Sequence, residues 1–343
     1  MLPGDGAVED ARRAAGRFAV GVEAVRSFGG GHINETFLAA TAAGDLVVQR
    51  LNLSVFPDPV AVTANIVAVH RHLAGACMPE PVPALDGGWL LRDGSGVWRA
   101  WRRVPGAAPV GLSTPGVARA AGRLLGEFHH RLAGLDPAAL TETLPGFHDP
   151  GRRLAALRAA VAADPLRRAA GVAAEIARAE AGAPLVILAA DLSARVRRRV
   201  CHYDAKLDNV LFAGATAVCL VDFDTVMPGA WFWDVGDLLR SAASTAAEDD
   251  PDPRRAVADP ALYRAVLDGY HEAQEGRPDG PTPAEREAVG YAGALVTYEQ
   301  AVRFLTDWIE GDVYYRTSRP EQNLDRARAQ FRLLASMPLS RIG

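Results

Sequence analysis

The sequence contains almost no lysine: of its 37 basic residues, Lys206 alone is a lysine and all the others are arginines. Cysteine is also scarce. Cys77, Cys201 and Cys219 fit neither a disulfide framework nor a zinc site by number or spacing. We therefore expect three buried thiols in a reducing cytoplasm. In a chain that uses arginine almost everywhere, the one retained ammonium group indicates a position with special chemistry.

Other absences narrow the class of protein. The net charge is −4, so no basic excess points to nucleic acid or to an anionic membrane as a partner. The longest apolar run, residues 183–190, is too short to span a bilayer, and residues 1–20 lack the apolar segment of a secretory signal. With 343 residues, 49% of them hydrophobic, the chain can build a sizeable core. We expect a cytoplasmic protein, a monomer or a weak homodimer.

The order of patterns along the chain predicts an α+β protein with two lobes. Residues 1–104 contain short strand-like segments and one helical pattern at 59–74, which predicts a small antiparallel β-sheet lobe. A segment rich in proline and glycine, 105–116, is the expected hinge. Residues 105–343 form a larger, mostly helical lobe, with helices at 117–134, 150–162, 167–181, 232–246, 260–273, 283–310 and 320–336. A polar hairpin at 198–226 interrupts these helices.

The hairpin carries the strongest functional signal. Asp204 precedes Asn209 by five residues, and Asp222 follows an apolar strand. This is the spacing of a kinase catalytic loop followed by a metal-binding aspartate. Asp204 is the predicted base for an attacking hydroxyl. Asn209 and Asp222 offer the oxygen ligands that Mg²⁺ prefers, and Lys206 is the predicted cation for the migrating phosphoryl group. His202 is expected to support the loop by hydrogen bonding.

Three neighbouring features leave alternatives open. Asp224 is a candidate second metal ligand, but it also suits an acceptor contact or a turn. Asp234 is expected to cap a helix and to steady the loop. The segment "VDFDT" also resembles the start of haloacid-dehalogenase-type phosphatases, which usually place a lysine well downstream. No lysine follows Lys206, which makes this alternative weak.

The small lobe offers candidates for ATP binding. Gly29, Gly30 and Gly31 lie between two predicted strands, where their backbone N–H groups can turn toward phosphates. Adenine is expected to pair with backbone in the segment from Arg102 to Val104.

A kinase usually also has a basic residue on its third strand. Arg50 is the candidate here and Gln49 the competitor, since strand alternation points them to opposite faces. The helix at 59–74 has no acidic residue to pair with such a cation.

The hairpin, the glycine loop and the order of the lobes resemble the aminoglycoside phosphotransferase and choline kinase superfamily, whose members phosphorylate small molecules on a protein-kinase-like fold. Further segments, among them "GGGHINETF", "DTVMPG" and "RFLTDWIEGDVYY", resemble the N-acetylhexosamine 1-kinases. This resemblance implies ATP and Mg²⁺ as cofactors. It also implies transfer of the γ-phosphate to the anomeric hydroxyl of N-acetylglucosamine or N-acetylgalactosamine.

The resemblance also implies a set of sugar contacts: His32, Arg303 and either Tyr314 or Tyr315. Trp231 and Trp233 suit either stacking on a sugar or filling the core. Tyr203 departs from the glycine or asparagine usual before the base, which bears on substrate choice. Two alternatives stay open. One is another acceptor on the same fold, such as an aminoglycoside, homoserine, choline or a different sugar. The other is a nucleotide-binding regulator without turnover.

Overall fold

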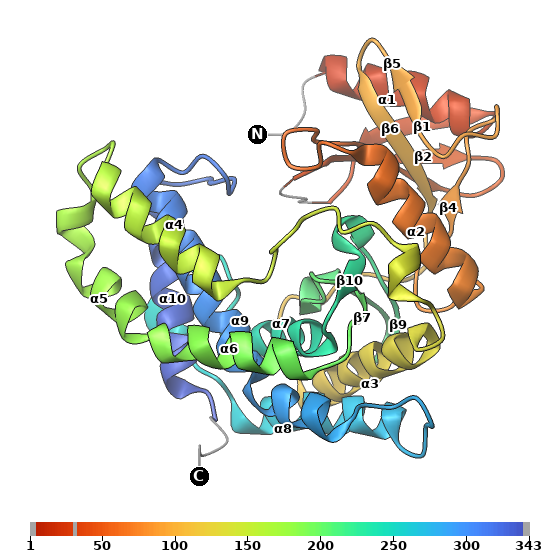
Figure 1. The fold of residues 1–343 in the computed structure, drawn as a ribbon. Helices are drawn as coiled ribbons and strands as arrows, with labels where there is room; N and C mark the ends of the chain where they lie inside the picture. Colours follow the sequence, from red (N-terminus) through yellow and green to blue (C-terminus); the bar gives the residue numbers. More distant parts are fainter. Residues whose placement is uncertain (1–4, 30–32, 339–343) are drawn as a thin grey trace.

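The computed structural model describes residues 5–29 and 33–338, and it has the predicted α+β architecture (Figure 1). An antiparallel sheet with strand order β1-β2-β3-β6-β4, to which β5 adds by pairing with β6, lies near the N-terminus. Its strands are β1 (Val22–Ser27), β2 (Glu35–Thr41), β3 (Leu46–Arg50), β4 (Pro81–Val82), β5 (Leu91–Asp93) and β6 (Gly96–Arg102). The predicted helix is α2 (Pro59–Leu73).

A second helix in this region, α1 (Asp5–Phe18), was not predicted from the sequence. It packs its small face on the sheet through Ala11, Ala14, Ala15 and Phe18, all of them buried. The segment alternates small and charged residues at helical spacing, so the signal was present in the sequence although it had not been used. The prediction of a single helix beside the sheet was therefore wrong, because two helices, α1 and α2, are present there.

Strand register decides which side chains of the sheet meet the rest of the protein. β3 pairs with β6 so that Gln49 lies opposite Arg99 and Arg50 lies opposite Trp98. Trp98 belongs to the apolar cluster under α1, whereas Trp101, on the other face of β6, packs with Phe223 of the hairpin. Because side chains alternate along a strand, Gln49 and Arg99 share the face that looks toward the hairpin.

The larger, C-terminal part of the chain consists mainly of helices. These are α3 (Pro115–Leu132), α4 (Pro150–Ala163), α5 (Ala173–Ala181), α6 (Ala183–Arg195), α7 (Trp231–Ala242), α8 (Pro260–Gln274), α9 (Pro283–Glu310) and α10 (Gln322–Ser336). Helix α6 comes from the apolar run at 183–190, for which no helix had been predicted. The described part of the chain also contains five short 3₁₀ helices: Pro137–Ala139, Ala169–Val172, Leu207–Asn209, Phe223–Thr225 and Pro253–Arg255.

Five of the helices begin with the same local device. An aspartate or threonine at the N-cap accepts a hydrogen bond from a backbone N–H of the first turn, and a proline follows at the next position. Such a cap satisfies an otherwise unpaired donor, and proline already has a helical φ and lacks an N–H. The pairs are Asp58–Pro59, Thr114–Pro115, Asp149–Pro150, Asp259–Pro260 and Thr282–Pro283. The starts of these helices are therefore set by local sequence.

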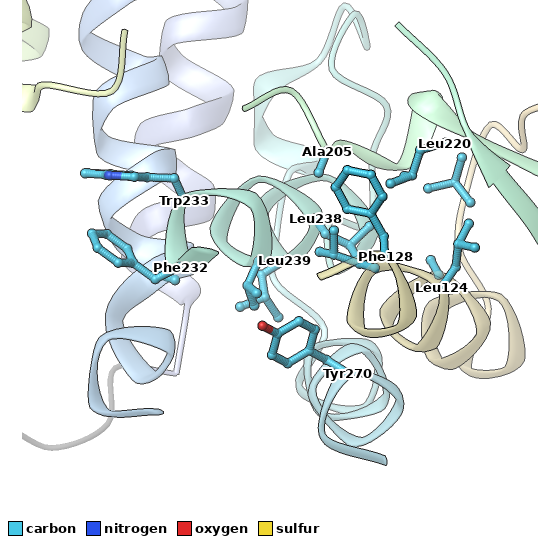
Figure 2. Packing of buried hydrophobic residues seen from close by; sticks show 14 of the residues in the cluster. Leu124, Phe128, Ala205, Leu220, Phe232, Trp233, Leu238, Leu239 and Tyr270 are labelled. Atoms are coloured by element: carbon cyan, nitrogen blue, oxygen red, sulfur yellow. The ribbon is translucent and has the colours of Figure 1, made fainter. Parts of the chain in front are cut away.

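The polar hairpin is split into two small strand pairs. β7 (Arg199–Cys201) pairs with β10 (Met227–Gly229), and β8 (Val210–Ala213) pairs with β9 (Thr216–Leu220). The largest apolar cluster surrounds this unit, and it joins α2 and α3 to α7, α8 and α9 (Figure 2). Helices α3 and α8 approach closely, since a Cβ on Gly122 would lie 2.1 Å from the carbonyl oxygen of Val266. The hairpin is thus part of the same core as these helices.

No helix in the described residues is long and apolar enough to cross a membrane.

Candidate active site

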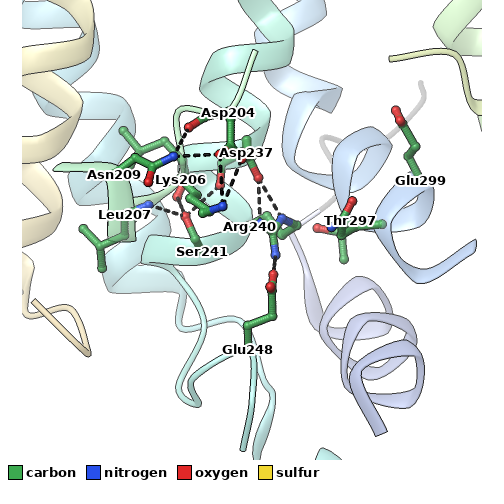
Figure 3. Close-up of polar contacts among 12 residues, drawn as sticks. Asp204, Lys206, Leu207, Asn209, Asp237, Arg240, Ser241, Glu248, Thr297 and Glu299 are labelled. Carbon is green, nitrogen blue, oxygen red and sulfur yellow. Dashed lines mark hydrogen bonds and ion pairs between the residues drawn. The ribbon is translucent and has the colours of Figure 1, made fainter. Parts of the chain in front are cut away.

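The turn between β7 and β8 brings three predicted residues together (Figure 3). Lys206 Nζ donates to both carboxylate oxygens of Asp204, at 3.0 and 3.2 Å. Asn209 Nδ2 donates to the same carboxylate at 2.7 Å and to the Asp204 carbonyl at 2.8 Å. Burial favours a raised pKa for Asp204, but the charge and hydrogen bond of Lys206 outweigh it, and the pKa lies below its ordinary value. Asp204 is therefore an ionised carboxylate at neutral pH.

Asp234 on α7 holds the start of this turn. It is fully buried and accepts hydrogen bonds from the backbone N–H groups of His202, at 2.8 Å, and of Tyr203, at 2.7 Å, and from His129 Nε2 at 2.9 Å. Burial favours a raised pKa for Asp234, yet the bond from His129 helps to keep it below its ordinary value. Helix α7 begins at Trp231 after Ala230, so Asp234 does not cap it. The predicted capping role was wrong, and the contacts with the loop are observed.

Tyr203 adopts the left-handed conformation, with φ 65°, which glycine and asparagine accept more readily. Its ring stacks on His148, with centroids 5.2 Å apart, and His148 in turn stacks on Trp233 at 5.0 Å. A Cβ on Gly229 would lie 1.9 Å from the Tyr203 hydroxyl. The bulky residue beside Asp204 therefore fits because position 229 has no side chain.

Asp222 follows strand β9, also in the left-handed conformation. The residue as a whole is exposed, and its carboxylate has no hydrogen-bond partner among the described residues. Neighbouring protein atoms nevertheless desolvate the carboxylate, and this effect, together with the negative charges of Asp224 and Asp204, raises the pKa of Asp222 to about 7. Excess negative charge of this kind is what a bound divalent cation relieves.

The donor set near Asp222 fits Mg²⁺. Because the Asn209 amide nitrogen is held by Asp204, its oxygen is left for another partner. No three His, Cys, Asp or Glu side chains within 5–29 and 33–338 form a metal site by themselves, so the candidate depends on this amide oxygen.

Contrary to the prediction, the carboxylate of Asp224 does not face the candidate metal site. It is 3% exposed, forms an ion pair with Arg99 of β6, and accepts a hydrogen bond from Asn34 Nδ2 at 2.5 Å. Both of its oxygens are thus held by residues of the sheet region. The structure replaces the predicted second metal ligand with a carboxylate that joins the hairpin to the sheet.

The predicted ATP-binding residues fall into three groups. Gly29 has φ 73°, a conformation that favours glycine, whereas Gly30, Gly31 and His32 lie outside the described residues. Arg50 forms ion pairs with Glu35 and Asp10 on the face of the sheet that α1 covers. The prediction that Arg50 faces the ATP phosphates was therefore wrong.

The segment after β6 leaves some backbone without partners. Arg102 donates its backbone N–H to the carbonyl of Glu80 at 2.7 Å. The backbone of Val104 has no partner in the described part of the chain. Of these two residues, Val104 is the one whose backbone can pair with a nucleotide base.

On the other side of the loop, Arg303 of α9 lies among aromatic rings. Its guanidinium group is 5.2 Å from the ring of Phe147, 5.8 Å from Tyr314 and 5.5 Å from Tyr315. Asp307, also on α9, accepts the backbone N–H groups of both tyrosines at 2.7 and 2.9 Å. The three predicted residues therefore form one cluster.

Sequence reasoning missed a second group beside this cluster. His148 Nδ1 donates to Glu299 at 3.0 Å, and Arg153 lies 3.5 Å from the same carboxylate. Glu299 is 1% exposed, and the charge and hydrogen bond of His148 keep its pKa low despite burial. A cavity of about 570 Å³ is lined by Phe147, His148 and Tyr203, among others. His148 lies in "TETLPGFHDP", and that segment was the only available signal.

Trp231 does not take part in this region. It is 2% exposed, one face stacks on His129 at 4.6 Å, and the Arg199 guanidinium lies 4.2 Å from its ring centre. Its indole N–H donates to the Val200 carbonyl at 3.0 Å. The predicted substrate contact was wrong, and Trp231 is a core residue.

Residues 24–285 match the family model described as "Phosphotransferase enzyme family", which is more than half of the chain. The chain belongs to this phosphotransferase family. This phosphotransferase is also similar to solved structures along almost its whole length.

One similar structure is an aminoglycoside phosphotransferase from Alicyclobacillus acidocaldarius, at 16% identity and a TM-score of 0.64, covering 98% of this chain and 95% of that one. Another is the amicoumacin kinase hAmiN in complex with AMP-PNP, Ca²⁺ and Ami, at 13% identity and a TM-score of 0.66, covering 98% and 95%. A third is the choline kinase LicA from Streptococcus pneumoniae, at 14% identity and a TM-score of 0.59, covering 96% and 99%. At these identities the likeness concerns the fold alone.

Proposed function

We propose that this phosphotransferase is an ATP- and Mg²⁺-dependent kinase that phosphorylates the anomeric hydroxyl of an N-acetylhexosamine, giving the sugar 1-phosphate and ADP. The carrying observation is the Asp204 carboxylate, held ionised between Lys206 and Asn209 and close enough to Asp222 to raise its pKa. Phosphoryl transfer requires these groups and little covalent chemistry from the protein.

Each residue has a part in the proposed reaction. Asp204 accepts a hydrogen bond from the attacking hydroxyl and receives its proton; an anomeric hydroxyl is relatively acidic, so orientation contributes as much as basicity. Lys206 lies within reach of the transferring phosphoryl group because its Nζ already contacts Asp204. Asn209 and Asp222 are the residues that would hold Mg²⁺. When bound, the ion supplies positive charge to the phosphate oxygens.

The charges around Arg303 favour a neutral, hydroxyl-rich acceptor. Arg153 lies 3.5 Å from Glu299, the positive charges of Arg303 and Arg153 both help to lower the pKa of Glu299, and the rings near Arg303 already surround a guanidinium group. A quaternary ammonium or a polycationic aminoglycoside would meet like charge here. Aromatic faces and fixed hydrogen-bonding groups suit a sugar ring. This supports an N-acetylhexosamine over choline or an aminoglycoside.

A screen for ADP release tests the proposal. Purified protein with ATP and Mg²⁺ is offered N-acetylglucosamine, N-acetylgalactosamine, glucose, galactose, kanamycin, choline and homoserine in turn. We expect the fastest ADP release with an N-acetylhexosamine, and phosphorus NMR should place the phosphate on the anomeric carbon. Preference for another acceptor would replace the sugar. ATP binding without ADP release for every acceptor would favour a regulator without turnover.

A further inference from the structure

The small sheet has a cation that faces the hairpin, although it is not on the third strand. Gln49 occupies the hairpin-facing position of β3, where a neutral amide cannot supply charge. Arg99 lies directly opposite it on β6 and is 3% exposed. The guanidinium group therefore lies at the face from which a kinase presents its phosphate-binding cation.

Gln49 fixes the orientation of this guanidinium group. Its Oε1 accepts hydrogen bonds from Arg99 Nε at 3.0 Å and Nη2 at 2.9 Å, and from Trp101 Nε1 at 2.9 Å. Three donors around one oxygen hold the planar group in a single direction. Asp224 completes the arrangement through its ion pair with Nη1.

These contacts do not use all the donors of Arg99. A guanidinium group has five N–H groups; Gln49 accepts two of them, and Nη1 meets Asp224 in an ion pair without a hydrogen bond. Nη1 therefore has no hydrogen-bond partner among the described residues, although Arg99 is only 3% exposed. Buried donors without partners are rare in proteins and often mark the place of a bound ion or ligand.

The position of Arg99 also matches that of the candidate metal site. Arg99 forms its ion pair with Asp224 of the hairpin, and this contact brings the guanidinium group to the segment that carries Asp222. Asp224, its ion-pair partner, lies two residues after Asp222. The guanidinium group is therefore close to the place where nucleotide phosphates and Mg²⁺ would meet.

We infer that Arg99 binds the phosphate groups of the nucleotide in place of a third-strand lysine, with Gln49 and Asp224 as positioning residues. This inference rests on the proposed kinase function. In the usual kinase arrangement, a lysine of the third strand pairs with an acidic residue of the helix in the small lobe. Here the corresponding ion pair joins Arg99 of β6 to Asp224 of the hairpin. Helix α2 is tied to the hairpin by a neutral side chain, since Asn65 Nδ2 donates to the Val226 carbonyl at 2.9 Å.

Calorimetric binding of ATP, ADP and adenosine to the full chain tests the inference. We expect Arg99→Gln to weaken ATP and ADP binding by at least about tenfold, because a charge-assisted hydrogen bond to phosphate is lost. Adenosine binding should change by less than about twofold, since the base does not contact Arg99. Arg99→Lys should recover part of the ATP affinity. Arg50→Gln, an arginine on the other face of the same sheet, is the matched control and should bind all three ligands as wild type.

A double variant separates binding from folding. Arg99→Gln with Asp224→Asn removes both charges and leaves two amides able to hydrogen-bond, so thermal stability should return toward wild type. If Arg99 binds phosphate, ATP affinity stays low in the double variant and the KM for ATP rises more than the KM for the acceptor. Recovery of ATP affinity together with stability, or equal losses for ATP and adenosine, would overturn the inference.

These outcomes also distinguish the inference from the function on which it rests. If wild type binds ATP and releases ADP but Arg99→Gln behaves the same, the kinase function stands and the role of Arg99 is wrong. If wild type binds no nucleotide, both are wrong.

Discussion

The catalytic turn and the hairpin-facing side of the sheet place their charged groups by different means. In the turn, Asp204, Lys206 and Asn209 are within six residues, so one loop conformation places all three. On the sheet, Gln49 and Arg99 are 50 residues apart and meet only through strand register. In the turn, the short spacing means that each functional group has only one possible position in the sequence. On the sheet, neighbouring strands place different residues side by side, so a cation on β6 can occupy nearly the same place as one on β3.

The largest expected effect is in the turn. Asp204→Asn should lower kcat by about 10³-fold, because the carboxylate that accepts the proton and pairs with Lys206 is lost. Steady-state ADP release measures it, with circular dichroism to confirm folding. Asp208→Asn, an exposed carboxylate on the same turn, is the control and should retain near wild-type turnover. A fully active Asp204→Asn would remove the turn from the chemistry.

Lys206→Arg asks whether the lone lysine is required there. A guanidinium group two residues from Asp204 would bind that carboxylate through two parallel bonds and lose its reach to the phosphoryl group. We expect kcat to fall by about 100-fold, the usual scale for a misplaced charged donor, with little change in melting temperature. Arg254→Lys, at an exposed site, is the reverse exchange and should be silent. Normal turnover of Lys206→Arg would make the lysine an accident of composition.

Gln49→Lys restores the usual third-strand lysine and tests the sheet side of the comparison. The new ammonium group would face Arg99 and remove the oxygen that three donors share. We expect a loss of about 2 kcal/mol in the free energy of unfolding, the usual cost of leaving buried donors unpaired. Urea denaturation measures it, with Arg92→Lys on β5 as the exposed control. An equally stable and active Gln49→Lys would show that either strand can carry the cation.

Asp222→Asn gives a pH-dependent effect. The folded protein raises the pKa of Asp222 to about 7, so it binds this proton more tightly than the unfolded chain does. The stability from that proton is complete below the unfolded pKa of about 4 and is lost as the pH rises through 7. In a metal chelator, Asp222→Asn should therefore raise the melting temperature at pH 8 and change little at pH 4. An equal shift at both pH values would contradict this origin.

The smallest effect is expected at Arg50. Arg50→Gln breaks partly exposed ion pairs with Glu35 and Asp10, which usually contribute up to about 1 kcal/mol. The KM for ATP should stay within about twofold of wild type, since the side chain faces α1. A large rise in the KM for ATP would instead indicate that Arg50 of the third strand contacts the phosphates.

The amino-acid sequence was sufficient to predict the α+β fold class, the turn and the ends of several helices. The turn residues are close in sequence, and the aspartate–proline and threonine–proline pairs act locally. The position of Asp222 after an apolar strand was equally visible. A group whose geometry is set within a few residues can be predicted from spacing.

Other features depended on contacts between distant segments. Alternation placed Gln49 and Arg50 on opposite faces, but only packing against α1 decides which face is which. Arg99 was not considered, because its pairing with Gln49 is set by register across α2 and the connecting loops. From the sequence, Trp231 is equally suited to the core and to a sugar contact. Only the structure shows that His129 and Arg199 cover its ring. The roles of Gly30, Gly31 and His32 stay predictions.

The contact between Tyr203 and Gly229 has a consequence for how this sequence can evolve. A side chain at 229 is incompatible with the tyrosine, whereas a small residue at 203 would leave room for one. The order of the two substitutions therefore matters. If position 203 changes to a small residue first, the intermediate protein can fold. If position 229 gains a side chain first, that side chain clashes with Tyr203. Exchange of the residue beside the base should thus follow a single order of mutations.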